Sequence, residues 1–82
     1  MTVAEYKKIW SWKTDEDDSL ILTAYKGEDK EVTIPVKIGE KQVKIIGEGV
    51  FRGKEIEKAI IPYGIKKIGF NAFADCKSLF EV

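Results

Sequence analysis

Residues 43–51 read VKIIGEGVF, and residues 65–73 read IKKIGFNAF. An apolar residue, an Ile-Gly pair, a small residue and a Phe recur in the same order, 22 residues apart. A second echo lies beside the first, because VTIP at 32–35 returns as AIIP at 59–62. Repeats of this length are typical of solenoids, in which each unit buries its apolar face only against its neighbours. The repeat therefore predicts an architecture, but it does not identify a ligand.

The composition is that of a folded domain. Hydrophobic residues make up 44% of the 82 residues and charged residues 34%, a balance unlike that of disordered chains. The net charge is zero, which argues against nucleic acid as a partner. No apolar run approaches the length of a membrane span, so we expect no membrane insertion. No signal peptide is visible at the N-terminus, so the sequence alone does not assign a location.

Few residues have the chemistry of a catalytic or metal site. The chain has one cysteine and no histidine, which excludes an intrachain disulfide, a His-based metal site and a His general base. The acidic run at 15–18 fails the calcium-loop pattern, because its sixth position is Leu20 and its twelfth is Lys26. We therefore predict no catalytic, cofactor-binding or metal-binding residues, and no enzyme activity.

The first part of the chain predicts a β-hairpin. Thr2 and Glu5 have capping-box spacing, and we expect either a short helix or a disordered segment at the start. A strand over about 9–13 then pairs with a strand over 20–25, and strict alternation places Leu20, Leu22 and Ala24 on one face. Tyr25 falls on the opposite face. The two tryptophans in this region are expected either to fill the hairpin core or to expose one ring for contacts with a protein or a sugar.

Within the repeat, we expect the apolar positions to form the core. The predicted core residues are Ile46, Phe51, Ile68, Phe73, Cys76 and Leu79. The two Phe side chains should stack in successive coils. Gly47 and Gly69 suit a sharp chain reversal or a positive φ, and Asn71 suits the N-cap of a helical turn.

The variable residues beside the repeat are the candidates for partner contact. If 32–35 and 59–62 are equivalent strands of one sheet, outward positions align as Glu31 with Lys58, Thr33 with Ile60, and Lys30 with Glu57. The same alignment continues to Glu81 and Phe80. This ladder either keeps the sheet solvated or, with its apolar positions, forms a contact surface. The candidate contact residues are Glu57, Lys58, Ile60 and Phe80.

Residues 61–82 follow the pattern IPxxIxxIGxxAFxxCxxLxxV. This pattern closely resembles the repeat of the BspA-like leucine-rich repeat family of bacterial surface proteins, and residues 43–62 match it less well. The resemblance implies a non-catalytic binding or adhesion module with a protein or glycan partner. It also implies a cell-surface or secreted location and no cofactor.

The expected architecture is mostly β with short helical turns (α+β), a small leucine-rich-repeat-like solenoid of about two coils preceded by an N-terminal hairpin. We expect a single domain over 1–82, with a cap or hairpin over 1–30, a first repeat over 31–60 and a second, truncated repeat over 61–82. The truncation suggests a fragment of a longer protein. An open strand edge near the C-terminus would allow self-association, and a purely structural N-terminal cap is the alternative role.

Overall fold

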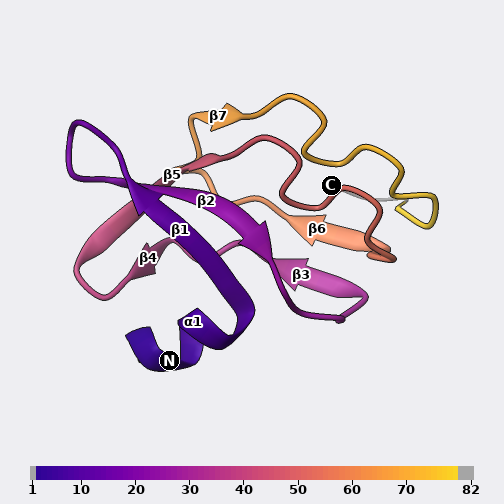
Figure 1. The fold of residues 1–82 in the computed structure, drawn as a ribbon, viewed down its shortest axis with the longest axis horizontal. Coiled ribbons are helices and arrows are strands. Elements are labelled where there is room, and N and C mark those ends of the chain that lie inside the picture. Colours follow the sequence, from indigo (N-terminus) through magenta and orange to yellow (C-terminus); the bar gives the residue numbers. More distant parts are fainter. Residues whose placement is uncertain (1, 80–82) are drawn as a thin grey trace.

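A computed structural model describes residues 2–79 (Figure 1). Most of its regular structure is strand, with one short helix. In chain order the elements are α1 (Val3–Ile9), β1 (Trp10–Thr14), β2 (Leu20–Tyr25), β3 (Glu31–Thr33), β4 (Lys37–Ile38), β5 (Lys41–Ile46), β6 (Lys58–Ile60) and β7 (Lys67–Ile68).

The strands form two sheets that follow successive coils of the chain. The larger sheet has the order β1-β2-β5-β4, with β7 also paired to β5, and the smaller one pairs β3 with β6. Strands β2, β5 and β7 pair in parallel, as do β3 and β6. Among the described strands, the β1–β2 and β4–β5 pairs are antiparallel. Parallel neighbours that are one coil apart in sequence define a solenoid, so the predicted fold class is confirmed.

The N-terminal region begins with a helix, which is one of the two alternatives that the sequence leaves open. Thr2 and Glu5 form a reciprocal capping box at the start of α1, and β1 pairs with β2 as a hairpin. The prediction that Tyr25 lies on the face of β2 opposite Leu22 is wrong. The register shifts between Ser11 and Trp12, which leaves Thr23 without an opposite residue. This bulge reverses the alternation, so Leu22 and Tyr25 are both buried.

The two repeats share their backbone conformation as well as their sequence. Gly49 and Asn71, 22 residues apart, have φ angles of 67° and 59°. Gly53 and Asp75 form a second such pair, with φ angles of 72° and 59°. Asn and Asp tolerate this left-handed region better than other non-glycine residues. Asn71 is therefore a left-handed turn residue rather than the predicted N-cap.

Backbone hydrogen bonds join the two coils along their length. In the first half of the coil, Lys66 donates to the Lys44 carbonyl and Gly69 donates to the Ile46 carbonyl, at 2.7 Å each. In the second half the direction reverses, and the amides of Gly49, Phe51 and Gly53 donate to the carbonyls of Phe70, Ala72 and Ala74. The bonds from Gly49, Phe51 and Gly53 satisfy backbone groups of segments that form no regular strand.

Gly47 and Gly69 have a different role from the predicted one, since neither has a positive φ. They allow close approach of the backbones of neighbouring coils. A Cβ on Gly47 would lie 2.5 Å from the Leu22 carbonyl oxygen, and one on Gly69 would lie 2.7 Å from backbone atoms of Gly47 and Glu48. The repeated Ile-Gly pair thus marks where one coil rests directly on the preceding one.

The core is centred on Phe51, which is fully buried. Its ring lies 5.7 Å from that of Trp10 and 5.3 Å from that of Tyr25, between centroids. It stacks on Phe73 at 5.1 Å and 10°, as the repeat predicts. Such aromatic clusters contribute much of the burial in small cores.

The six predicted core residues differ in burial. Ile46 and Phe51 are fully buried, and Phe73, Cys76 and Leu79 pack against the core while partly exposed. The prediction is wrong for Ile68, whose side chain is 46% exposed. Ile68 lies on β7, and no described strand pairs with the far edge of β7 to cover it.

The acidic segment between β1 and β2 is a turn. Asp15 donates its amide to the Ser19 carbonyl at 2.8 Å, and Asp18 has a φ of 68°. The Asp17 carboxylate accepts hydrogen bonds from the hydroxyl and amide of Ser19 and pairs with Lys44 at 3.2 Å. These contacts, the Ser19 hydroxyl first, lower the pKa of Asp17 to about 2.

This lowered pKa predicts a pH-dependent stability. Because the folded-state pKa of Asp17 is below the unfolded value of about 3.9, its contribution is present above pH 4 and is lost as the pH falls through about 2. Asp17→Asn should therefore lower the melting temperature at pH 5 but not near pH 2. Thermal melts of both proteins from pH 5 to pH 2 test this, and a constant difference over that range would contradict it.

Candidate interaction surface

Strands β3 and β6 bring the predicted contact residues together. Their parallel register places Glu31 opposite Lys58, Val32 opposite Ala59 and Thr33 opposite Ile60. The ladder predicted from the repeat is thus confirmed for these positions. Lys30 and Glu57, the next pair along, form an ion pair with 3.7 Å between Nζ and Oε2.

The burial along β6 alternates as expected for a strand with one solvent-facing side. Ala59 is buried, whereas Ile60 is 45% exposed, and Glu57 and Lys58 are half-buried. Tyr63, just beyond the strand, is fully exposed. The predicted contact residue Phe80 and the predicted neighbour Glu81 lie outside the described residues.

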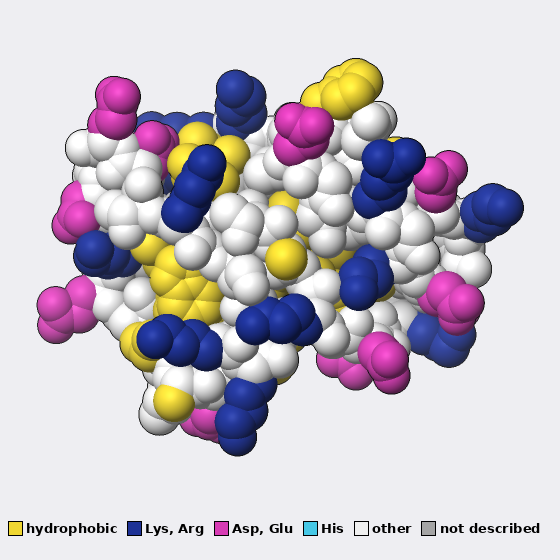
Figure 2. Space-filling view, in the orientation of Figure 1, with side chains coloured by type: hydrophobic (Ala, Val, Ile, Leu, Met, Phe, Trp, Pro, Cys, Tyr) yellow, Lys and Arg dark blue, Asp and Glu magenta, His cyan; other side chains and the backbone are white. Residues whose placement is uncertain are grey.

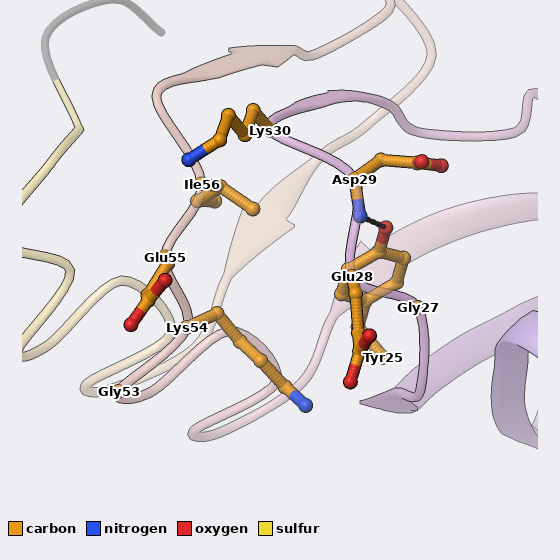
Figure 3. Close-up of a pocket in the computed structure, with 9 residues that line it drawn as sticks. All are labelled: Tyr25, Gly27, Glu28, Asp29, Lys30, Gly53, Lys54, Glu55 and Ile56. Atoms are coloured by element: carbon orange, nitrogen blue, oxygen red, sulfur yellow. Dashed lines mark hydrogen bonds between the residues drawn. The ribbon is translucent and has the colours of Figure 1, made fainter.

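A pocket that the sequence did not predict adjoins this pair of strands. It has a volume of about 460 Å³ and lies between the segment that links β2 to β3 and the segment that leads into β6 (Figure 3). Lys30 and Ile56, which come just before β3 and β6, connect the pocket to the strands. The lining residues are Tyr25, Gly27, Glu28, Asp29, Lys30, Gly53, Lys54, Glu55 and Ile56.

The apolar part of the pocket comes from Tyr25 and Ile56, both of which belong to the core. The Tyr25 hydroxyl oxygen accepts a hydrogen bond from the Asp29 amide at 3.3 Å, which is drawn in Figure 3. Burial raises the pKa of Tyr25, so the phenol is neutral at physiological pH. A Cβ on Gly27 would lie 2.5 Å from the Tyr25 hydroxyl oxygen, so a larger residue here would require the Tyr25 side chain to shift.

Charged side chains form the rim. Figure 3 shows Lys54 extending between Glu28 and Glu55, and its Nζ lies 6.0 Å from the centroid of the Tyr25 ring. Glu28, Asp29 and Glu55 take part in none of the four ion pairs found among residues 2–79. The pocket therefore offers a partner an apolar floor and charges of both signs.

The metal-binding and thiol chemistry of residues 2–79 is limited. Among residues 2–79, no group of three or more His, Cys, Asp or Glu side chains is arranged to hold a metal ion. Cys76 donates its thiol to the Phe51 carbonyl at 2.9 Å, and burial raises its pKa. A raised pKa disfavours the reactive thiolate, so Cys76 acts in packing.

The pocket has weak sequence signals. Its residues come from the segments that precede β3 and β6, which the alignment of 32–35 with 59–62 places on neighbouring coils without predicting a hollow between them. The Tyr-x-Gly turn at 25–27 was visible, but it indicates only the end of a strand. The acidic rim is spread over two segments and forms no motif.

Comparisons with known proteins identify the fold. No family model and no curated protein matches the sequence. Among solved structures, a leucine-rich repeat protein of T. pallidum has 25% identity over 90% of this chain, with a TM-score of 0.87. A leucine-rich cell surface protein of Faecalibacterium prausnitzii has 29% identity over 85%, with a TM-score of 0.81. A leucine-rich repeat protein of Bacteroides capillosus has 26% identity over 92%, with a TM-score of 0.84.

These similarities define the fold class: the chain has the fold of these bacterial leucine-rich repeat proteins. They agree with the BspA-like repeat family that residues 61–82 resemble. The match covers 36%, 20% and 60% of the three solved chains, in the same order. In the described part of this chain, no helix is long and apolar enough to cross a membrane.

Proposed function

We propose that this chain is a non-catalytic module that binds a protein partner through one surface, called here the contact surface. It consists of Glu57, Lys58, Ile60 and the adjoining pocket of Figure 3. The observation that carries the proposal is Ile60. It is 45% exposed at an outward position of β6, and the segment that leads into β6 lines a pocket with an apolar floor and a charged rim. Protein interfaces combine a small apolar centre with such a polar rim.

Two further features support a binding role over catalysis. The solved structures of similar fold are described as leucine-rich repeat proteins, two of them without further function and one as a cell surface protein. The one thiol of the chain is used in packing, as described above. We propose a surface or secreted location and a role in adhesion by analogy with the cell surface protein of F. prausnitzii.

The second candidate role is self-association, or the capping of a repeat array. It is favoured by Ile68 and Phe70, which are 46% and 75% exposed beside β7. No described strand pairs with the far edge of β7, and an open edge next to exposed apolar side chains can pair with another chain.

We further propose that residues 1–82 act as one folded unit, because the core cluster extends from Trp10 to Ala72.

The test uses the full chain as bait against a phage-displayed peptide library. We expect enriched peptides whose affinity falls at least tenfold for the double variant Lys58→Ala/Ile60→Ala, because loss of a central contact typically costs more than 1 kcal/mol. The matched control, Thr23→Ala/Lys37→Ala, changes two exposed residues away from the contact surface and should bind within twofold of the wild type.

Three outcomes separate the roles. Weaker binding with an unchanged melting temperature supports the contact surface. A lower melting temperature with unchanged binding supports a structural cap. Sedimentation velocity of the chain alone then tests self-association, and a monomer at all concentrations excludes it. Failure to enrich any peptide above background would overturn the proposal of a protein partner.

A further inference from the structure

The N-terminal hairpin has two hollows that share one wall. The first has a volume of about 300 Å³ and is lined by Lys7, Trp10, Ser11, Trp12 and Lys26. The second, of about 430 Å³, has Trp12 and Lys7 in its lining, with residues of β4 and β5 on its other side. Trp12 therefore borders both hollows, and Lys7 lies beside it in each.

Trp12 differs from Trp10 in what it can contact. Trp10 is buried against Tyr25 and Phe51, whereas Trp12 packs against the core and remains partly exposed. A partly exposed indole offers a flat apolar surface and an N–H donor to a ligand that enters beside it. Because Trp12 lines hollows instead of protruding, it is suited to stacking and poorly suited to insertion into a bilayer.

The first hollow is positively charged. The charged residues that line it, among those that the structure describes, are Lys7 and Lys26. The Lys26 ammonium donates to the Lys7 carbonyl at 2.8 Å, which holds it near the end of α1. Among residues 2–79, neither lysine takes part in an ion pair. Figure 2 shows an apolar surface over the region of α1 and β1 with Lys or Arg side chains around it.

We propose that Trp12, Lys7 and Lys26 form a binding site for an acidic saccharide, a sugar that carries carboxylate or sulfate groups. The indole packs against the apolar C–H face of a sugar ring, and the two ammonium groups pair with its anionic group. The Ser11 hydroxyl and the indole N–H supply hydrogen bonds to sugar hydroxyls. This site lies on the hairpin, so the inference does not depend on the contact surface proposed above.

A saccharide fits these features better than the other anionic ligands. Single-stranded nucleic acid is usually held by several aromatic side chains along a basic groove, whereas the first hollow has one partly exposed indole and two lysines. An extended acidic peptide would use a strand edge and would not need the indole. The shallow, open form of both hollows suits one or two sugar rings.

The experiment measures binding to the full chain by isothermal titration calorimetry at two NaCl concentrations, about 20 mM and about 300 mM. Charges interact over a longer distance at the lower concentration, because the screening length falls as the salt concentration rises. The probes are a galacturonate hexasaccharide, a heparin hexasaccharide and the neutral maltohexaose. We expect the acidic probes to bind at least tenfold more tightly than the neutral one at low salt, and to weaken at high salt. The two acidic probes show whether carboxylate or sulfate is preferred.

Variants then assign the site. Lys7→Gln/Lys26→Gln should weaken binding of the preferred acidic probe at least tenfold, whereas the matched control Lys66→Gln/Lys67→Gln, which removes two exposed lysines of the second coil, should leave it within twofold. Trp12→Phe should retain most of the affinity, and Trp12→Leu should lose at least fivefold. Melting temperatures show whether either Trp12 variant is folded, and the lysine variants test the site independently.

Several results would overturn the inference. These are no saccharide binding at millimolar concentration, equal binding of maltohexaose, or equal losses in the site and control lysine variants. Equal affinity for a hexamer of deoxythymidylate would show general attraction to polyanions, and binding to phosphatidylserine vesicles with none to the saccharides would show a membrane surface instead.

Discussion

Phe51→Ala is expected to remove a large share of the stability of the fold. Phe51 is fully buried and contacts the rings of Trp10, Tyr25 and Phe73. Truncation of such a side chain costs about 3–5 kcal/mol. A domain of 82 residues has a total stability of about 4–12 kcal/mol, so this loss is a large share of the total. Urea denaturation followed by far-UV circular dichroism measures the change in the free energy of unfolding.

The matched control for this substitution is Phe70→Ala. Phe70 follows β7 in the second coil and is 75% exposed, so the same change of side chain should alter the free energy of unfolding by less than about 0.5 kcal/mol. Similar losses for the two variants would show that Phe51 is not the centre of the core. A large loss at Phe70 alone would instead show that the exposed coil is covered in solution, as self-association predicts.

Gly47→Ala is expected to have the second largest effect. The added Cβ would lie 2.5 Å from the Leu22 carbonyl oxygen, which also accepts the Gly47 amide at 2.8 Å. The Leu22 carbonyl oxygen belongs to the backbone and the position of the Cβ is fixed by the backbone of residue 47. Relief of the overlap therefore requires the neighbouring strands to separate. We expect a loss of about 1–3 kcal/mol in the free energy of unfolding, measured by the same urea titration.

Two other glycines serve as controls for Gly47. A Cβ on Gly64 meets no atom within 4 Å, and its φ does not favour glycine, so Gly64→Ala should change stability by less than about 0.5 kcal/mol. Gly49 also has open space around it, but its φ is 67°, so Gly49→Ala should cost about 1 kcal/mol from backbone strain alone. If Gly64→Ala and Gly47→Ala had equal effects, close approach between coils would not explain the repeated Ile-Gly pair.

The repeat predicted the contacts between residues that occupy equivalent positions in the two coils. The pairing of Thr33 with Ile60 and the stacking of Phe51 on Phe73 both depend on positions one repeat apart, and the structure has both. Features that break the equivalence were not predictable in this way. The buried Tyr25 depends on a bulge in β2, and bulges have no clear sequence signal in so short a strand.

The candidate site was only half visible in the sequence for a related reason. Ile60 could be placed on an outward face because strands alternate. The pocket before β3 and β6 could not be placed, because the alignment puts 27–30 and 54–57 on neighbouring coils but does not show whether their side chains leave a hollow. Ile68 was predicted as core because its equivalent Ile46 is core, but burial of a repeat residue depends on a neighbour on each side.

The hydrogen bonds between the coils have one more consequence. The first coil accepts at Lys44 and Ile46 and donates at Gly49, Phe51 and Gly53. This row of acceptors followed by donors has a polarity, so a coil that ran in the reverse direction, or was displaced by one residue, would bring like groups together. An additional 22-residue unit that follows the same pattern therefore fits in one orientation and one register only, which makes growth of such an array directional.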